Sequence, residues 1–246
     1  MGIPLTLATQ PWAAKPHCGG DRTACDACDV RTLAVCSALT GEQIPRLAAI
    51  ARDRHVAAGQ TLFLEGDPAE DVFTLTTGML TLYKLMSDGR RQITGFLVPG
   101  DFLGLAFGRS YVYGAEAVTP ATLCRFRRPQ FLALLEEFPA MEKALLGRAA
   151  TELAANQEQM LLLGRKTARE RLASFLLRLA SRQGMGEGTP IELPMSRSDI
   201  ADFIGLTIET VSRTFTQLRK EGVVRLPDAH RVTVLSWPRL ERVAGG

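Results

Sequence analysis

The residues whose types and spacing most clearly suit a chemical role are cysteines near the start of the 246-residue chain. Cys25 and Cys28 form a Cys-x2-Cys pair, seven residues separate Cys28 from Cys36, and Cys18 precedes the pair. A fifth cysteine, Cys124, lies far along the chain. Four thiolates can hold either a tetrahedral Zn²⁺ ion or an iron–sulfur cluster.

Other uses of these cysteines are less favoured. Structural zinc sites more often combine two Cys-x2-Cys pairs, and this chain has one. A disulfide-exchange pair normally opens a helix in a β-α-β setting, which the sequence lacks. A redox enzyme or electron carrier is also disfavoured, because the three histidines show no catalytic or metal-binding spacing and no glycine-rich nucleotide loop appears.

The cellular location follows from two absences in the sequence. No apolar run approaches the roughly 18 residues that a membrane span needs, and no secretory signal is readable. We therefore expect a cytoplasmic protein without membrane contact, in a reducing compartment where disulfides are unusual.

A second constellation lies near the C-terminus. Ser196 and Asp199 have the spacing of a capping box at the start of a helix. Gly205 fits a tight turn, and Thr207 is placed to cap a second helix over residues 208–219. Helix, turn and helix in this order predict a helix-turn-helix.

The second of these helices carries residues suited to reading DNA. Glu209, Ser212 and Arg213 share one face, at positions i, i+3 and i+4. In a major groove, Arg213 could donate to guanine, Glu209 could accept from cytosine, and Ser212 could touch a base or a phosphate. A surface ion pair between Glu209 and Arg213 is the alternative. Thr207 and Arg197 complete the expected DNA-binding set.

The distribution of charge agrees with a nucleic-acid-binding module at the C-terminus. Residues 165–246 contain 14 Lys and Arg against 9 Asp and Glu, whereas residues 1–164 contain 15 against 17. A basic C-terminal third beside an acidic remainder fits a DNA-binding unit joined to a different unit, although charge alone fits a solvated basic surface equally well. In that remainder, turns at roughly ten-residue intervals separate β-rich runs and predict a small antiparallel barrel or roll.

A long helix is expected between the two parts. Its apolar positions repeat with a 3-4-3-4-3 spacing that continues for about three heptads. Such a seam favours a partner helix, and a two-fold homodimer is the commonest arrangement. The expected dimer interface consists of Leu146, Ala149, Leu153, Asn156, Met160 and Leu163. Asn156 is the polar residue in this seam, where it should lower dimer stability while fixing the register.

These features together resemble a known family. Thr207-Ile208-Glu209-Thr210-Val211-Ser212-Arg213 resembles the recognition helix of the Crp/Fnr superfamily, in particular its FNR branch. The resemblance extends over residues 92–96, 99–101, 160–163 and 170–175. It implies a regulator of transcription that binds pseudo-palindromic double-stranded DNA of the type TTGAT-N4-ATCAA and contacts RNA polymerase. The Ser87–Arg91 turn resembles the family's polymerase-contact loop, with Arg90 and Arg91 where acidic residues are familiar.

The fold class implied is α+β, with four parts. Residues 1–37 form a cysteine-rich segment, and residues 38–138 form an antiparallel β-roll sensor domain of the cyclic-nucleotide-binding type. Residues 139–165 form the dimerisation helix, and residues 166–246 form a winged helix-turn-helix. The wing is expected as a hairpin of residues 223–226 and 231–235 around Pro227-Asp228.

The resemblance also implies a cofactor. FNR-branch regulators hold an oxygen-labile 4Fe-4S cluster with three clustered cysteines and one distant cysteine, which here would be Cys25, Cys28, Cys36 and Cys124. The spacing is similar to that of FnrL-like regulators, and Cys18 is left over. The implied function is oxygen-responsive activation of transcription by a dimer. The alternative is a regulator of the same type that senses another ligand or redox signal, with zinc or no metal at the cysteines.

A cyclic nucleotide is a rival ligand for a sensor of this type. Relatives that bind one place a glutamate after the glycine equivalent to Gly104 and an Arg-Ser or Arg-Thr pair later in the chain. Here Leu105 follows Gly104, and Tyr113-Gly114 occupies the place of the pair. We therefore disfavour a cyclic nucleotide relative to the cluster.

Overall fold

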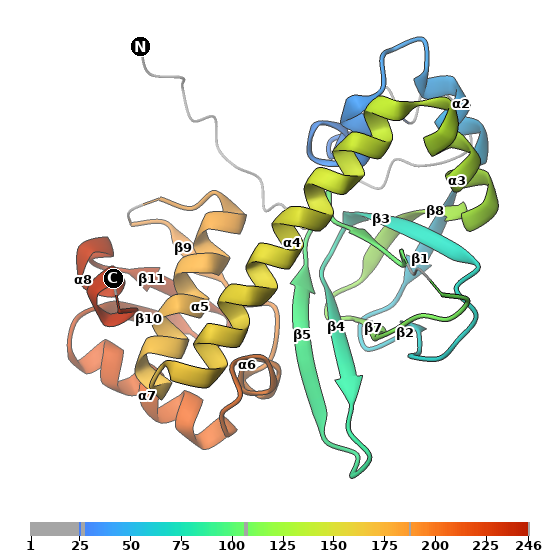
Figure 1. Ribbon diagram of the computed structural model, residues 1–246. Coiled ribbons are helices and arrows are strands. Elements are labelled where there is room, and N and C mark those ends of the chain that lie inside the picture. Colours follow the sequence, from blue (N-terminus) through green and yellow to red (C-terminus); the bar gives the residue numbers. More distant parts are fainter. Residues whose placement is uncertain (1–24, 26–27, 106–107, 187, 246) are drawn as a thin grey trace, which may run out of the picture. The chain divides into compact units, whose positions relative to one another are not determined.

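The structure is a computed structural model that describes residue 25 and residues 28–105, 108–186 and 188–245 (Figure 1). The chain divides into two compact units. Residues up to 84 and residues 94–150 belong to the first unit, and residues 85–93 and those from 151 onward belong to the second.

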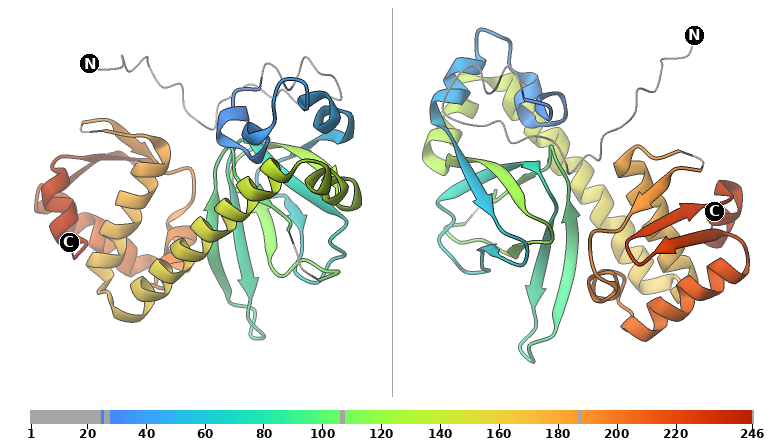
Figure 2. Two further views of the ribbon diagram at one scale, coloured as in Figure 1. Left: turned by 45° about the horizontal axis from the view of Figure 1, so that its top comes forward. Right: turned by 180° about the vertical axis from the view of Figure 1, so that it is seen from behind.

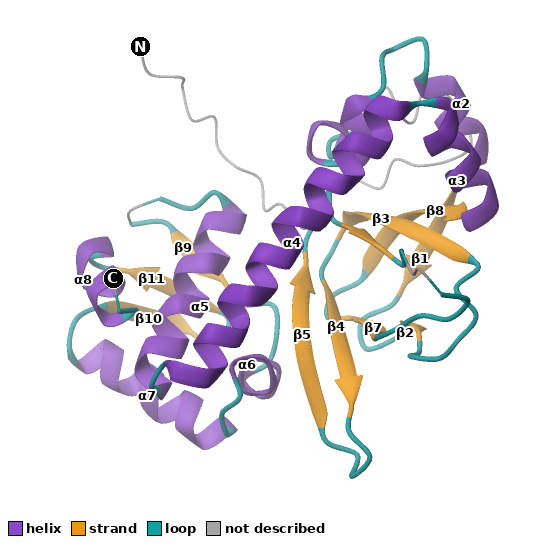
Figure 3. Cartoon of the chain, viewed as in Figure 1, coloured by secondary structure: helices purple, strands orange, loops and turns teal. Residues whose placement is uncertain are grey.

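The first unit is mainly a β-roll with helices on one side (Figure 3). It begins with two 3-10 helices, η1 (Arg31–Leu33) and η2 (Val35–Ala38), and helix α2 (Ile44–Ile50). Its strands are β1 (Ala51–Val56), β2 (Thr61–Phe63), β3 (Asp71–Thr77), β4 (Leu80–Leu85), β5 (Arg91–Leu97), β6 (Phe102–Leu103), β7 (Gly114–Ala117) and β8 (Ala121–Arg127). Helix α3 (Arg128–Glu137) follows the last strand.

The strands form two four-stranded sheets. One has the order β1-β8-β3-β6 and the other the order β2-β7-β4-β5. The pairings of β8 with β1 and β3, and of β7 with β2 and β4, are antiparallel. Strands β4 and β5 form a long hairpin that is visible from both sides (Figure 2).

The roll contains two hydrophobic cores. One lies between the sheets and includes Leu75, Leu80 and Leu123. The other lies between the helices and the first sheet and includes Cys124 and Phe126. Successive residues of a strand point to opposite faces, so Leu123 belongs to the first core and Cys124 to the second. This alternation places Cys124 beneath the N-terminal helices.

Helix α4 (Pro139–Arg165) covers the range expected for the long helix. Leu146, Leu153 and Met160 recur at seven-residue intervals along it, and their side chains are 64%, 60% and 72% exposed. Three large apolar residues on one stripe indicate a surface made for a partner. Although α4 is long, no helix in the described part of the chain is both long and apolar enough to cross a membrane.

The second unit is a winged helix-turn-helix. Its remaining elements are α5 (Ala168–Gln183), β9 (Pro190–Glu192), α6 (Arg197–Ile204), α7 (Ile208–Lys220), β10 (Val224–Asp228), β11 (Arg231–Val234) and α8 (Trp237–Val243). The three strands form a sheet with the order β10-β11-β9. The predicted α+β architecture, with a β-roll, a long helix and a winged helix-turn-helix, is thereby confirmed.

The wing differs from the sequence prediction in the position of its turn. Pro227 and Asp228 lie inside β10, and the turn follows at residues 229–230. The strand register shifts between Arg225 and Asp228. Proline cannot donate a ladder hydrogen bond, so a bulge at this point accommodates it. The Asp228 carboxylate then accepts hydrogen bonds from the His230 backbone N–H, at 2.8 Å, and from Arg231.

Candidate cysteine site and DNA-binding surface

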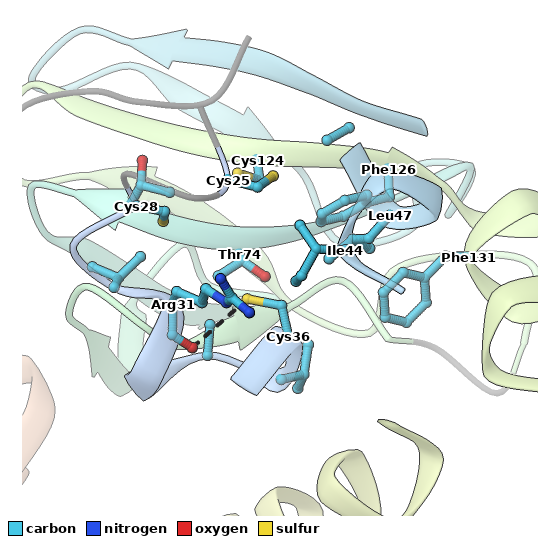
Figure 4. Close-up of a pocket in the computed structure, with 15 residues that line it drawn as sticks. Cys25, Cys28, Arg31, Cys36, Ile44, Leu47, Thr74, Cys124, Phe126 and Phe131 are labelled. Carbon is cyan, nitrogen blue, oxygen red and sulfur yellow. Dashed lines mark hydrogen bonds between the residues drawn. The ribbon is translucent and has the colours of Figure 1, made fainter. Parts of the chain in front are cut away.

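Four cysteines from distant parts of the sequence line a single pocket in the first unit (Figure 4). Cys124 is buried in the core beneath the helices, and Cys25 and Cys36 pack against that same core. Cys28 is half-buried. These four are the ligands implied by the family resemblance, whereas Cys18 lies outside the described residues. Further residues lining the pocket are Val30, Arg31, Ala34, Val35, Ile44, Leu47, Ala51, Thr74, Thr76, Phe126 and Phe131.

The pocket disfavours ionised thiols. Burial raises the pKa of the Cys36 thiol to about 11, and the neighbouring Cys28 and Cys25 add to this shift. Burial also raises the pKa of the Cys28 thiol. Both thiols would therefore keep their protons at neutral pH unless a cation displaced them. Reactive redox cysteines have depressed pKa values, so these two have the character of structural or metal-binding residues.

The donor set fits an iron–sulfur cluster in number and chemistry. Four cysteine sulfurs line a mostly apolar pocket, and cysteine sulfurs are the ligands that such clusters use. Cys25, Cys28 and Cys36 are free cysteines, whereas Cys124 is disulfide-bonded in this structure, so it would have to be reduced before it could serve as a ligand. Within the described ranges, however, no three His, Cys, Asp or Glu side chains are arranged to hold a metal ion. Binding of a cluster would therefore require the segment that carries Cys25, Cys28 and Cys36 to rearrange around it.

The helix-turn-helix is built by local signals that the sequence contains. The Ser196 hydroxyl accepts from the Asp199 N–H at 3.0 Å, and the Asp199 carboxylate accepts from the Ser196 N–H at 2.9 Å, which completes the capping box of α6. Gly205 ends α6 with a left-handed φ of 64°, a conformation that favours glycine. Thr207 caps α7 by accepting from the Thr210 N–H. Helix α6 thus lies between the predicted cap Ser196 and the predicted turn glycine Gly205, and α7 begins at the predicted residue and ends one residue later than predicted, at Lys220.

Helix α7 separates into a buried and an exposed face. Val211, Thr214, Phe215 and Leu218 are buried. Glu209, Ser212 and Arg213 are exposed, and Ser212 and Arg213 help to line a shallow hollow together with Thr216, Gln217 and Lys220. This arrangement leaves the three residues expected to read bases accessible from one side.

The charges on this face suit contact with base edges. Hydrogen bonds from its own backbone N–H and from Thr207, together with the charge of Arg213, lower the pKa of the Glu209 carboxyl, so it is an acceptor at neutral pH. The Arg213 guanidinium donates to the Thr210 hydroxyl at 3.2 Å. Sequence reasoning passed over Ile208, which is exposed at the first position of α7. An exposed isoleucine at that point could contact the methyl group of a thymine.

Arg197 has a different environment from the other residues in the expected DNA-binding set. Its guanidinium lies 3.6 Å from the centre of the Phe215 ring, and burial lowers its pKa. Its buried Nη1 atom has no hydrogen-bond partner among the described residues. Stacking on Phe215 joins the start of α6 to the buried face of α7. Arg197 therefore packs within the unit instead of extending freely into solvent.

A clamp that sequence reasoning missed joins α4 to the helix-turn-helix. Arg171 on α5 donates to the carbonyls of Leu163 at 2.8 Å and Lys166 at 2.9 Å, at the end of α4. The same guanidinium donates to the carbonyls of Ile204 and Gly205, at 3.0 and 3.1 Å. These are carbonyls that helix ends leave without helical partners. No local pattern marks such a role.

The expected dimer interface is only partly exposed in a single chain. Ala149 and Asn156 are exposed along with Leu146, Leu153 and Met160. Leu163 is half-buried, and its side chain lies 3.0 Å from the position that a Cβ atom on Gly205 would occupy. The stripe available to a partner therefore runs from Leu146 to Met160.

Aromatic side chains make close contacts near Gly104 and Asp71 in the roll. The Gly104 N–H donates to the Tyr113 hydroxyl at 3.1 Å. The Phe63 and Tyr111 rings stack with their centres 3.7 Å apart, and the Tyr111 hydroxyl donates to the Asp71 carbonyl.

Comparison with known proteins supports the same architecture. A family described as the Crp-like helix-turn-helix domain matches residues 170–243, and one described as the cyclic nucleotide-binding domain matches residues 53–138. The solved structure of FixK2 from Bradyrhizobium japonicum has a TM-score of 0.74 and 37% sequence identity, covering 79% of this chain and 97% of that chain.

Two curated relatives align over nearly their whole length. The transcriptional activatory protein AadR of Rhodopseudomonas palustris is 45% identical over 231 residues, covering 88% of this chain and 95% of AadR. The transcriptional activator protein FnrL of Cereibacter sphaeroides is 39% identical over 228 residues, covering 90% and 92%. The chain therefore belongs to the Crp/Fnr family, whose members are DNA-binding transcription regulators and not enzymes.

Proposed function

We propose that this regulator activates transcription in response to the absence of oxygen. This proposal rests mainly on the observation that Cys25, Cys28, Cys36 and Cys124 line one pocket. With a 4Fe-4S cluster held by these four thiolates, the chain pairs through α4 and binds a TTGAT-N4-ATCAA-like operator. A bound cluster would supply sensitivity to oxygen. Without the cluster, the two chains would pair more weakly through α4.

The spacing of the cysteines and the similarity to FnrL support a cluster over a lone zinc ion. A Cys-x2-Cys pair, one nearby cysteine and one distant cysteine match the spacing of FnrL-like regulators, and FnrL itself is 39% identical to this chain. The raised pKa values of Cys28 and Cys36 mean that a cation must compensate for removal of their protons. Zinc, or no metal with a different signal, is the alternative.

The residues that contact DNA are assigned from their positions on the second unit. Arg213 donates to guanine, Glu209 accepts from the paired cytosine, and Ser212 contacts a neighbouring base or phosphate. Thr207 and Arg197 complete the proposed DNA-binding set, and the cap of α7 and the stack on Phe215 hold them in place. A homodimer places two such helices in successive major grooves of a pseudo-palindromic site.

We propose that the Ser87–Arg91 turn, between β4 and β5, contacts RNA polymerase. The turn between these strands is held by the Asp88 carboxylate, which accepts from the Arg90 N–H at 3.0 Å and from its guanidinium at 2.7 Å. A preformed exposed turn suits contact with a partner protein, because little conformational freedom is lost on binding.

We expect Arg213→Ala to weaken specific binding by about 1–3 kcal/mol and to relax the preference for one guanine per half-site. Competition binding against operators altered at each position measures this. Arg219→Ala, which removes the same charge from another exposed position of α7, serves as the matched control and should leave base preference unchanged. An equal loss of affinity for operator and random DNA would show that Arg213 contacts phosphate and does not read a base.

The proposed function is tested by operator binding with and without air. Protein purified without air should bind the TTGAT-N4-ATCAA operator at least about tenfold more tightly than the same protein after exposure to air, a difference of roughly 1.4 kcal/mol. A scrambled operator at the same salt concentration controls for electrostatic binding. Equal affinity in both states would exclude oxygen as the signal.

A further inference from the structure

Arg148 connects the cysteine-bearing segment to helix α4 within the first unit. Its side chain extends from α4, where one guanidinium nitrogen donates to the Leu33 carbonyl and the other donates to the Gly100 carbonyl at 3.2 Å. Arg148 is half-buried; its bond to the Gly100 carbonyl is partly shielded from water, whereas its bond to the Leu33 carbonyl is exposed. Hydrogen bonds from a charged donor are stronger than those between neutral groups.

Leu33 belongs to the tight turns between Cys28 and Cys36. Its N–H donates to the Val30 carbonyl at 2.9 Å, and the Cys36 thiol lies 3.8 Å from the Arg31 carbonyl. Two 3-10 helices separated by a single residue fill this stretch. Movement of Cys28 or Cys36 therefore carries the Leu33 carbonyl with it.

The Gly100 carbonyl provides a reference point fixed to the sheet. The Gly100 N–H donates to the Leu75 carbonyl at 2.8 Å, and the Leu75 N–H donates to the Asp101 carbonyl at 2.9 Å. The φ angle of Gly100 is 97°, and a Cβ atom there would lie 2.7 Å from the Leu33 Cβ. The cysteine-bearing segment thus packs directly on a turn that is tied to β3.

On α4, Arg148 lies beside the stripe that a partner helix would cover. It follows Leu146 by two residues and precedes Ala149, and both of these are exposed. Leu146, Arg148 and Ala149 therefore lie on the same turn of α4, and Arg148 extends from that turn to Leu33 and Gly100. A change in the position of Leu33 is therefore transmitted to this turn of the helix by a single side chain.

We propose that Arg148 is a positioning residue that couples the state of the cysteine-bearing segment to dimerisation through α4. This inference rests on the proposed function, because it assumes that the segment changes when a cluster is gained or lost. In one state, Arg148 holds the Leu146–Ala149 turn in register with the sheet. In the other, it loses the Leu33 carbonyl, and the turn is no longer fixed for pairing.

The test uses full-length protein, with Arg148→Gln as the main variant. Sedimentation gives the dimer dissociation constant of air-free and air-exposed protein, and iron and sulfide are measured on the same air-free samples. Arg148→Gln should keep its iron and sulfide, while the ratio of the two dissociation constants falls about tenfold or more toward one. Arg148→Lys, which can reach only one carbonyl at a time, should give an intermediate ratio.

Lys143→Gln is the matched control, since it removes an exposed positive charge from the same helix. An equal fall in the ratio in this control would overturn the proposal in favour of a general effect of charge. Loss of iron in Arg148→Gln would show that Arg148 only supports the cysteine-bearing segment. An unchanged ratio of the two dissociation constants would exclude coupling between that segment and dimerisation. Wild-type protein without iron, or with a ratio of one, would instead refute the proposed function.

Discussion

Serine at any one of Cys25, Cys28, Cys36 or Cys124 should abolish cluster binding and reduce operator affinity in air-free protein to that of air-exposed wild type. A hydroxyl is a poor ligand for iron compared with a thiolate, and all four cysteines line the same pocket. Operator affinity should therefore fall about tenfold or more, which is the full difference expected between air-free and air-exposed wild type. Visible absorption and operator binding, both measured without air, report the two effects.

Cys18→Ser is the control, because Cys18 is not among the four assigned ligands and lies outside the described residues. Cys124 also belongs to the hydrophobic core, so its replacement by serine buries a hydroxyl there. Cys124→Ala keeps the site apolar and separates loss of a ligand from loss of stability, with thermal unfolding of both variants as the check. A cluster that survives in Cys124→Ala, or that disappears only with Cys18→Ser, would contradict the ligand assignment.

Replacing Asn156 with leucine should make the cluster-free protein dimerise and bind its operator in air. Asn156 lies between Leu153 and Met160 on the exposed stripe of α4, where two copies would face each other across the dimer. A polar residue at one seam position lowers the stability of a helix pair while fixing its register. We expect the dissociation constant of the cluster-free dimer to tighten about tenfold or more. Sedimentation in air measures this constant for wild type and variant.

Leu153→Asp provides the opposite change on the same stripe. Both positions are exposed in the single chain, so neither substitution should impair folding of the monomer. Two facing carboxylates would repel, and the air-free protein should become monomeric. A cluster-free wild type that is already a tight dimer, or an Asn156→Leu variant that remains monomeric, would show that Asn156 sets register without limiting dimerisation.

The helix-turn-helix was the part of the fold most readily predicted from the sequence. Its capping box, its turn glycine and the cap of α7 each depend on residues within a few positions of one another. Local hydrogen bonding decides these features, so a linear pattern is enough to find them. The turn of the wing was misplaced because Pro227 normally marks a turn, and here a bulge admits it into β10.

Interactions between distant residues could not be derived in this way. The stacking of the Arg197 guanidinium on Phe215 of the following helix is one such interaction. Arg171 and Arg148 each bind carbonyls in segments that the sequence does not relate to them. Cys124 was linked to the N-terminal cysteines by family resemblance alone, since nothing in its local sequence indicates which side of the roll it faces.

Iron and acid-labile sulfide analysis of protein purified without air tests the central claim most directly. If Cys25, Cys28, Cys36 and Cys124 hold a 4Fe-4S cluster, the protein should contain about four irons and four sulfides per chain. It should also show broad visible absorption that fades on exposure to air. One zinc ion per chain without sulfide, or a metal-free protein that binds its operator equally well in both states, would contradict the account.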